Sequence, residues 1–583
     1  MNDSYFQKYP DQAFQTLINR LNGKNLEELL LFSSFISIFD FFDTIDFSYN
    51  IFAPVINVEL INLLSQAICR SKSQMYKDGA INKQDLDFFY CQWLNTIGFR
   101  EKKVECQIDK QRAAIQQLLA MMNIQLRFQN HRINQRHTRC YILFCDIPNR
   151  YKEQLEKELQ GAYISIRDEF QNKYGISVDL YFMFGMFFFF MFRNYFRKIY
   201  PQELSLQKRA EIISIDPEPT KSGNKYLFDK IEGLFRIYSL CRPTLKSIII
   251  HSNIFANTSL DYQFKKYLQM MSTNIHTLRS MTHKGSKFNK GLILDQLNPL
   301  ERYPLVEFKS NKYIIPNIRY LSFSISDSFH YILQDCFPEN QYNMTLGKIQ
   351  EIYIKELIES SFKPCFMLEE LIYAKGKDEI RGPDLALFSD QLCIIESKSK
   401  RPSAQLRSDP GSISFHSEMK NIQDAFIRGI NKVNDILSEI DIYSKYHQEI
   451  ETAKKKQPIV IVIIGEGFEI PMEILIHHIK YSNFANLPSY PFKFALLNLS
   501  LLEEFVALSH KREIPIMQIF DTISIISSLA NDDYPGMEYY IERYYEKMNK
   551  VNFPYFEEKI QQLQKDIALT IKLIEDSHKV YNP

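Results

Sequence analysis

The stretch 381–400 constrains this chain more than any other, because charged residues there flank two short apolar runs. The runs 384–388 and 392–398 predict two strands, and the polar residues between them predict a tight turn. An antiparallel pairing about that turn places Asp384 opposite Glu396, with their Cβ atoms about 5 Å apart. The sequence therefore predicts that two carboxylates meet at one end of an apolar hairpin.

Lys398 adds a positive charge to this end of the hairpin. It lies two residues after Glu396, and because side chains alternate along a strand, the two share one face. Carboxylates buried in apolar surroundings cost free energy unless cations compensate their charge. We therefore predict a divalent metal ion bound by Asp384 and Glu396.

The motif Pro383-Asp384, followed by an apolar hairpin and Glu396-Ser397-Lys398, resembles the signature of the PD-(D/E)XK, or restriction-endonuclease-like, nuclease superfamily. The resemblance implies an α-β-β-β-α-β core and metal-assisted hydrolysis of phosphodiester bonds. It implies Mg²⁺, or Mn²⁺ in its place, held by Asp384, Glu396 and the carbonyl of Ser397. Lys398 is then expected to position the attacking water and to offset negative charge.

The elements before the hairpin fit the same resemblance. Apolar residues recur on one face over 345–358, which predicts a helix. The resemblance implies that Glu351 on this helix approaches the metal and joins the catalytic set. A strand is predicted at 366–373, where Glu369 and Glu370 are rival acidic ligands.

After the hairpin, the sequence predicts an amphipathic helix over 421–437 and strands at 458–465 and 492–499. The first of these strands is apolar throughout, which indicates a central strand covered on both faces. The resemblance implies that a polar or basic residue of the helix lies near the scissile phosphate. The candidates for this role are Gln423, Arg428 and Asn431.

A second match to the bare pattern of an Asp, a gap and Glu-x-Lys occurs at Asp295 with 307–309. That match lies in a predicted hairpin over 303–316, whose partner strand follows it. The motif needs its Asp on the preceding strand, so we assign the site to Asp384 and Glu396.

A chain of 583 residues exceeds what one hydrophobic core usually serves, so several domains are expected. The predicted fold class is a multidomain combination of α+β and α/β. The apolar run 180–192 is shorter than the roughly 20 residues of a membrane span, which predicts a buried core helix. The four predicted ranges are a mainly helical scaffold or regulatory region at 1–300, a hairpin-plus-helix connector at 301–340, the nuclease domain at 341–510 and a helical C-terminal tail at 511–583.

The net charge of +1 predicts no general basic surface, so contacts with nucleic acid must come from local patches. The candidate patches are 132–139, 283–290 and 398–407. The third patch directly follows the predicted active site, which favours it as a contact to nucleic acid.

Nine cysteines without a CxxC pair indicate reduced thiols, as in cytoplasmic proteins. The N-terminus has neither the basic nor the apolar region of a signal peptide. We therefore expect a cytoplasmic protein that does not associate with membranes. The run 140–145 contains two of the cysteines and is predicted to be a buried strand rather than part of a zinc site.

Two classes of function are compatible with these features. The first is a metal-dependent nuclease, for which DNA is favoured over RNA as the substrate without RNA being excluded, and for which defence against foreign DNA is the expected role. The alternative is a non-cleaving protein that keeps a nuclease-like fold to bind nucleic acid or a protein partner. The complete set of Asp384, Glu396 and Lys398 favours the nuclease. The sequence has no GxxxxGK[ST] motif, so any nucleotide-driven translocation needs a separate subunit. A protein activator and a homo-oligomer are both compatible with the sequence.

Overall fold

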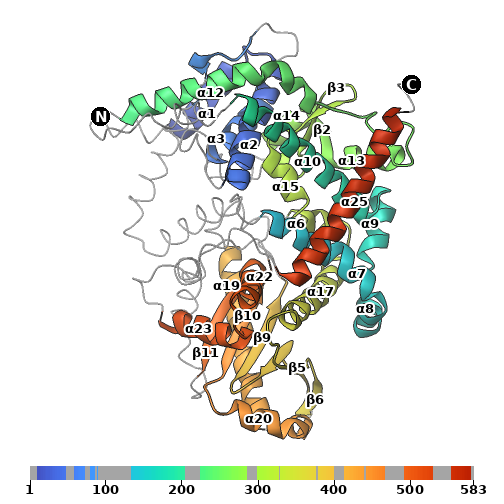
Figure 1. Ribbon diagram of the computed structural model, residues 1–583, viewed down its shortest axis with the longest axis vertical. Helices are drawn as coiled ribbons and strands as arrows, with labels where there is room; N and C mark the ends of the chain where they lie inside the picture. The colour runs from blue at the N-terminus through green and yellow to red at the C-terminus, as the bar shows by residue number, and fades with distance from the viewer. Residues whose placement is uncertain are drawn as a thin grey trace. The chain divides into compact units, whose positions relative to one another are not determined.

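A computed structural model gives the structure of the chain, which divides into two compact units (Figure 1). The first unit is made of Met1–Ile133, Arg167–Cys336 and Gln564–Pro583, and the second of Asn134–Ile166 and Phe337–Leu563. The structure describes residues 9–47, 58–72, 79–85, 88–89, 133–203, 223–284, 299–326, 328–375, 378–399, 413–438, 441–465, 492–529 and 553–579.

These units differ in part from the four predicted ranges. The predicted start of the nuclease domain at 341 lies close to Phe337, where the main segment of the second unit begins. The segment Asn134–Ile166, which the sequence placed in the helical scaffold, clusters with the second unit. The predicted tail at 511–583 is divided between the two units at Leu563.

The first unit is mainly helical and contains a four-stranded sheet in the order β1-β4-β3-β2. The predicted hairpin at 303–316 is confirmed, since β3 and β4 pair antiparallel. The strands of this unit are β1 (Ile250–His251), β2 (Ser272–Asn274), β3 (Leu305–Lys309) and β4 (Lys312–Ile314). Its helices are α1 (Tyr9–Leu21), α2 (Leu26–Phe47), α3 (Val58–Arg70), α9 (Ile166–Tyr174), α10 (Val178–Glu203), α12 (Gly223–Leu245), α13 (Asp261–Met271), α14 (Ile275–Lys284), α15 (Ile318–Ser324) and α16 (Phe329–Gln334).

Helix α10 forms the centre of the first unit, as predicted for the apolar run 180–192. Phe184, Phe188 and Phe192 on this helix are fully buried. Within the described residues, no single helix is long and apolar enough to cross a membrane. Helix α9 and Val178–Ile199 pass that test only as a pair, which is bent by 72°. Among the described cysteines, Cys69, Cys336, Cys365 and Cys393 form no disulfide bond.

The second unit combines helices with a five-stranded sheet and a separate two-stranded sheet. Its helices are α6 (Ile133–Tyr141), which runs through a π-helical turn (Ile142–Asp146) into α7 (Ile147–Arg150), then α8 (Lys152–Leu159), α17 (Glu339–Glu359), α19 (Ile413–Leu437), α20 (His447–Ala453), α22 (Leu499–Arg512), α23 (Ile516–Leu529) and α25 (Pro554–Lys579), which belongs to this unit up to Leu563. Its strands are β5 (Phe366–Glu369), β6 (Ile372–Lys375), β7 (Asp378–Arg381), β8 (Leu385–Phe388), β9 (Leu392–Lys398), β10 (Ile459–Ile464) and β11 (Lys493–Asn498).

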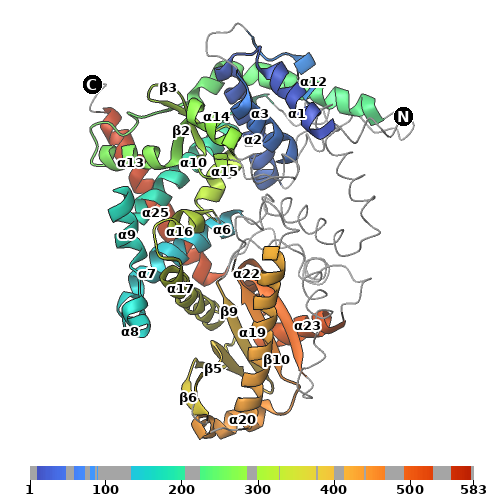
Figure 2. The same ribbon diagram turned by 180° about the vertical axis from the view of Figure 1, so that it is seen from behind.

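The larger sheet has the strand order β11-β10-β9-β8-β5. Strands β5, β8 and β9 are antiparallel neighbours, whereas β9, β10 and β11 run parallel. Every residue of β10 is buried, which confirms the prediction of a central, doubly covered strand. Helix α19 packs along β9 and β10 (Figure 2). The chain is thus a mixture of helix and sheet, as the predicted α+β class requires.

Two helices lie on opposite faces of β9. Glu396 is in contact with α19 through Lys432, whereas Ser397 accepts a hydrogen bond from Gln350 of α17. Because successive side chains of a strand point to opposite faces, α19 and α17 cover different faces of the sheet. The end of β9 is therefore enclosed from both sides.

The predicted strand at 140–145 is wrong, because this run is helical from α6 into α7. Periodicity does not distinguish a short apolar run in a strand from one in a buried helix. The predicted basic patch at 132–139 is also wrong for the described residues 133–139. Arg139 is buried and pairs with Glu503 at 2.8 Å, and Tyr353 donates to the same carboxylate at 2.6 Å. The patches 283–290 and 398–407 lie mostly outside the described residues.

The predicted strand at 366–373 divides into β5 and β6. Strand β5 pairs with β8 in the larger sheet, but β6 leaves it and pairs with β7. The break falls at Glu370 and Leu371, and Gly382 donates to the carbonyl of Leu371 at 2.6 Å. A Cβ at residue 382 would lie 3.0 Å from that oxygen, so a glycine fits this close approach.

Candidate active site

The β8–β9 hairpin has the predicted register. Leu385 pairs with Ile395, so Asp384, the residue before β8, falls opposite Glu396. The Oδ2 of Asp384 accepts a hydrogen bond of 2.6 Å from the backbone N–H of Ser397. The side chain of Asp384 is thereby held at the end of β9, beside the second carboxylate.

Glu396 is almost fully buried, with 1% of its side chain exposed. Its Oε1 accepts a hydrogen bond from Lys432 Nζ at 2.6 Å. Its Oε2 is buried and accepts no hydrogen bond, although Lys398 Nζ lies 3.8 Å away. Burial and the negative charge of Asp384 raise the pKa of Glu396, against the opposing effect of the two lysines.

Lys398 lies on the same face as Glu396, as predicted, and is partly exposed. Its ammonium donates to the carbonyl of Ser397 at 2.9 Å. The Ser397 hydroxyl accepts a hydrogen bond of 3.0 Å from Gln350 of α17. The predicted carbonyl ligand and the predicted catalytic lysine are therefore in direct contact.

Glu351 projects from α17 and forms an ion pair with Lys348 at 3.1 Å. Burial and then the negative charge of Asp384 raise the pKa of Glu351 to about 7, although Lys348 opposes this shift. The charge of Glu370 adds to the same rise. This mutual influence indicates that Glu351, Glu370 and Asp384 share one electrostatic site.

The structure distinguishes the two rival acids on the first strand. Glu369 is 56% exposed and pairs with Lys355 at 2.6 Å. Burial and the charge of Asp384 raise the pKa of Glu370, whose side chain is 21% exposed. Glu370 is therefore the acid that belongs to the site.

Lys432 of α19 was not among the predicted site residues, yet it donates a hydrogen bond to Glu396 at 2.6 Å. Of the predicted candidates on this helix, Arg428 and Asn431 are exposed and Gln423 is partly exposed. The sequence contained a partial signal for Lys432, because it follows Ala425 by seven residues and precedes Ile436 by four, which places it on the apolar face of the helix. A lysine on the buried face of an amphipathic helix calls for a partner.

Gly429 allows α19 to pack closely over this site. A Cβ at this position would lie 2.6 Å from Val460 Cγ1 and 3.5 Å from Glu396 Cγ. The first distance is shorter than a van der Waals contact, so a larger residue at this position would require the Val460 side chain or the helix to move. Gly429 therefore fixes the distance between α19 and the carboxylate that Lys432 contacts.

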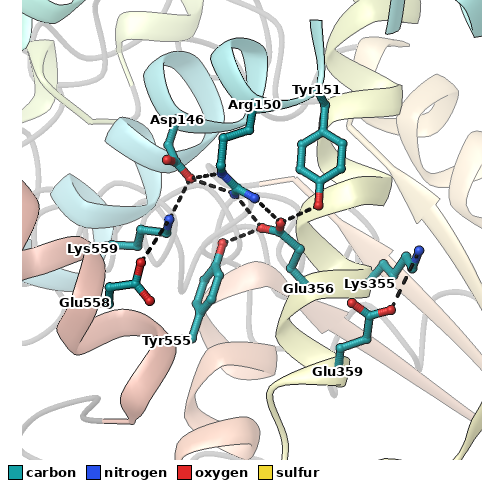
Figure 3. A network of polar contacts seen from close by, with 9 residues as sticks. All are labelled: Asp146, Arg150, Tyr151, Lys355, Glu356, Glu359, Tyr555, Glu558 and Lys559. Carbon is teal, nitrogen blue, oxygen red and sulfur yellow. Dashed lines mark hydrogen bonds and ion pairs between the residues drawn. The ribbon is translucent and has the colours of Figure 1, made fainter. Parts of the chain in front are cut away.

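A polar network around Glu356 joins α17, which carries Glu351, to neighbouring helices (Figure 3). Glu356 accepts hydrogen bonds from Arg150, from Tyr151 at 2.7 Å and from Tyr555 at 2.7 Å. Arg150 belongs to α7 and Tyr555 to α25. The network thus connects α17 to α7 and to the start of α25.

Neither protein-family models, nor curated proteins, nor solved structures match this chain. The candidate site is therefore defined by the geometry of its own residues.

The carboxylates of Asp384 and Glu396 and the carbonyl of Ser397 fit a hard divalent cation by their chemistry, because such cations prefer oxygen ligands. The buried Oε2 of Glu396 lacks a hydrogen-bond donor, and the charge of Asp384 raises the pKa of its acidic neighbours. A cation would relieve both unfavourable features. In the part of the chain that the structure describes, however, no three Asp, Glu, His or Cys side chains are arranged to hold a metal ion.

Proposed function

We propose that this protein is a metal-dependent nuclease that hydrolyses phosphodiester bonds in DNA, with defence against foreign DNA as its role. The observation that carries the proposal is the placement of Asp384 opposite Glu396, with Lys398 on the same face. The order α17, β5, β8, β9, α19, β10 also supports it, because it is the α-β-β-β-α-β order of the restriction-endonuclease-like core. The β6–β7 hairpin is an insertion within this order.

In this proposal, Asp384, Glu396 and the Ser397 carbonyl hold Mg²⁺ or Mn²⁺, and Glu351 or Glu370 completes the set. The bound metal supplies Lewis acidity, which lowers the pKa of a coordinated water and offsets charge on the phosphate. Lys398 positions the attacking water and stabilises negative charge through its ammonium. Asp384 also orders the end of β9 through its hydrogen bond to Ser397 N–H.

The electrostatics of the site support this assignment. Burial and the charge of Asp384 raise the pKa values of Glu351, Glu370 and Glu396. Each of these acids in its charged form therefore lowers the stability of the fold. Groups of acids with raised pKa values are typical of sites that bind cations or transfer protons. The cost of this arrangement is therefore consistent with a catalytic use.

The test is cleavage of single-stranded DNA, double-stranded DNA and RNA by the purified chain with Mg²⁺ or Mn²⁺. We expect cleavage of DNA that EDTA blocks, and a loss of about 100- to 1,000-fold or more in the rate for Lys398→Ala. Asp384→Ala should lose cleavage as well. Asp390→Ala is the matched control, because Asp390 lies at the opposite, exposed end of the same hairpin and pairs with Lys456.

One observation favours the alternative of a non-cleaving nucleic-acid-binding protein. The proposed ligands are already in contact with ammonium groups, since Lys432 pairs with Glu396 and Lys398 with the Ser397 carbonyl. Under this alternative, the wild-type chain binds nucleic acid without cutting it, and this binding does not depend on a metal ion. Binding that persists in EDTA, together with an absence of cleavage for all three substrates, would establish it.

A further inference from the structure

Three of the expected metal ligands each contact a lysine. Lys432 donates to Glu396 Oε1 at 2.6 Å, and Lys398 donates to the Ser397 carbonyl at 2.9 Å. Glu351 pairs with Lys348 at 3.1 Å. The negative charge at the site is thus already shared among ammonium groups of the chain itself.

Lys432 differs from the other two lysines in its surroundings. Its side chain is 12% exposed, compared with 26% for Lys398 and 20% for Lys348. Lys348 divides its charge between Glu351 and Glu158, which lies 2.8 Å away. Lys432 is the lysine most closely tied to a single buried carboxylate, because its partner Glu396 is 1% exposed.

We propose that Lys432 competes with the divalent cation for Glu396 and thereby sets the metal affinity of the site. This inference rests on the proposed function, because it assumes that Glu396 is a metal ligand. Lys432 acts through Glu396, so it is a residue that tunes affinity and not a catalytic residue.

The competition follows from the electrostatics of a single carboxylate. The charge of Glu396 attracts any cation that reaches it, and the ammonium on Oε1, 2.6 Å away, already offsets part of that charge. The same ammonium repels a second cation at Oε2, and burial weakens the screening of this repulsion by water. After removal of this ammonium, Lys398, which lies 3.8 Å from Oε2, is the remaining lysine that offsets the charge of Glu396, so the carboxylate attracts a metal ion more strongly.

The packing of α19 keeps this competitor in place. Gly429, one turn before Lys432, brings the helix so close that a Cβ there would lie 3.5 Å from Glu396 Cγ. An exposed lysine would exchange freely with solvent, whereas Lys432 extends from a helix that packs directly on β9. The helix therefore delivers the ammonium to the carboxylate in a defined position.

The experiment measures binding of Mn²⁺ alone to the full-length chain, after removal of metal with EDTA, from the EPR signal of the free ion. We expect Lys432→Met to tighten binding by about 10- to 100-fold, the size of effect that partners of metal ligands commonly have. Lys432→Arg keeps the charge and should stay close to the wild type. Lys420→Met, at an exposed position of the same helix, is the matched control and should not change binding. Glu396→Gln should abolish the site.

The outcomes separate this inference from the proposed function. Wild-type binding that depends on Glu396, together with equal or weaker binding by Lys432→Met, overturns the inference and leaves the nuclease proposal standing. An absence of binding in both the wild type and Lys432→Met overturns both proposals. Hydrogen exchange of β9 and β10 checks that the variant is folded. If Lys432→Met does not fold, Lys432→Gln carries the same expectation, since it keeps a hydrogen-bond donor without the charge.

Discussion

Replacement of Lys432 by Met should destabilise the second unit to an extent that depends on pH. The substitution keeps much of the side chain but removes the ammonium that donates to Glu396 at 2.6 Å. Because Glu396 is 1% exposed, water does not replace the lost partner. Removal of one member of a buried ion pair typically costs about 3–5 kcal/mol.

Protonation of Glu396 limits this cost. A carboxyl group with an ordinary pKa of 4.5 takes up a proton at pH 7 for about 3.4 kcal/mol, and at pH 5 for about 0.7 kcal/mol. Without Lys432, the pKa of Glu396 in the folded state rises further above its unfolded value. The folded state then binds more protons than the unfolded state, so the stability of the variant falls as the pH rises above about 4.5. We expect a loss of at most about 3 kcal/mol at pH 7 and below about 1 kcal/mol at pH 5.

The assay is hydrogen exchange of peptides from β9 and β10 in EDTA at both pH values, expressed as the free energy of opening. The double variant Glu396→Gln with Lys432→Met is the control, and its loss should not depend on pH because the carboxyl group is absent. A loss for Lys432→Met that is equal at pH 5 and pH 7 would refute the argument. So would the absence of any loss at pH 7.

Three further predictions concern the stability of the chain in EDTA. Burial and the charge of Asp384 raise the pKa of Glu351 to about 7, so the folded state loses stability as the pH rises from about 4.5 to 7. Glu351→Gln should therefore raise the free energy of unfolding by about 2–3 kcal/mol at pH 8 and change it very little at pH 4. Thermal unfolding at both pH values checks this expectation. Gly429→Ala places a Cβ 2.6 Å from Val460 Cγ1 and should cost about 1–3 kcal/mol, and an unchanged Tm would contradict the close packing of α19. Hydrogen bonds to Glu356 lower its pKa against the effect of burial, so the stability that its charge contributes is present at pH values above the pKa of the unfolded state and is lost as the pH falls. Glu356→Gln should lower the free energy of unfolding by about 1–3 kcal/mol at pH 7 and by less at pH 3. Equal shifts in Tm at the two pH values would contradict this.

The hairpin register was predictable because two simple rules determine it. Side chains alternate with a period of two, and a tight turn fixes which residues pair. Together they placed Asp384 opposite Glu396, and the structure has this pairing. The buried strand β10 was also predictable, because a continuous run of β-branched apolar residues is typical of a parallel strand covered on both faces.

Lys432 was not predicted, because the sequence does not show which face of a helix meets which strand. Candidates on α19 were chosen for their polar side chains, and two of them, Arg428 and Asn431, are exposed. The close approach of Gly429 to Glu396 depends on packing between elements 33 residues apart in sequence. Such long-range packing requires the tertiary structure.

The errors in secondary structure have a local cause. The apolar run 140–145 has the composition of a strand, but its neighbours continue a helix, and short apolar runs fit either state. The run 366–373 has the apolar composition of a strand on both sides of Glu369 and Glu370, yet β5 and β6 pair with different strands. Strand composition does not specify a pairing partner, so the sequence did not show that the chain changes its partner strand at this point.

The most direct test of the central claim is Mg²⁺-dependent cleavage of double-stranded DNA by the wild type and by Asp384→Asn. Asparagine keeps an oxygen that can accept the hydrogen bond from Ser397 N–H, so the variant removes the charge of Asp384 without removing this contact. We predict that the wild type cleaves, that EDTA stops it, and that the variant is inactive while its β9 amides stay protected. Cleavage by the variant at the wild-type rate would contradict the assignment of the active site to this hairpin.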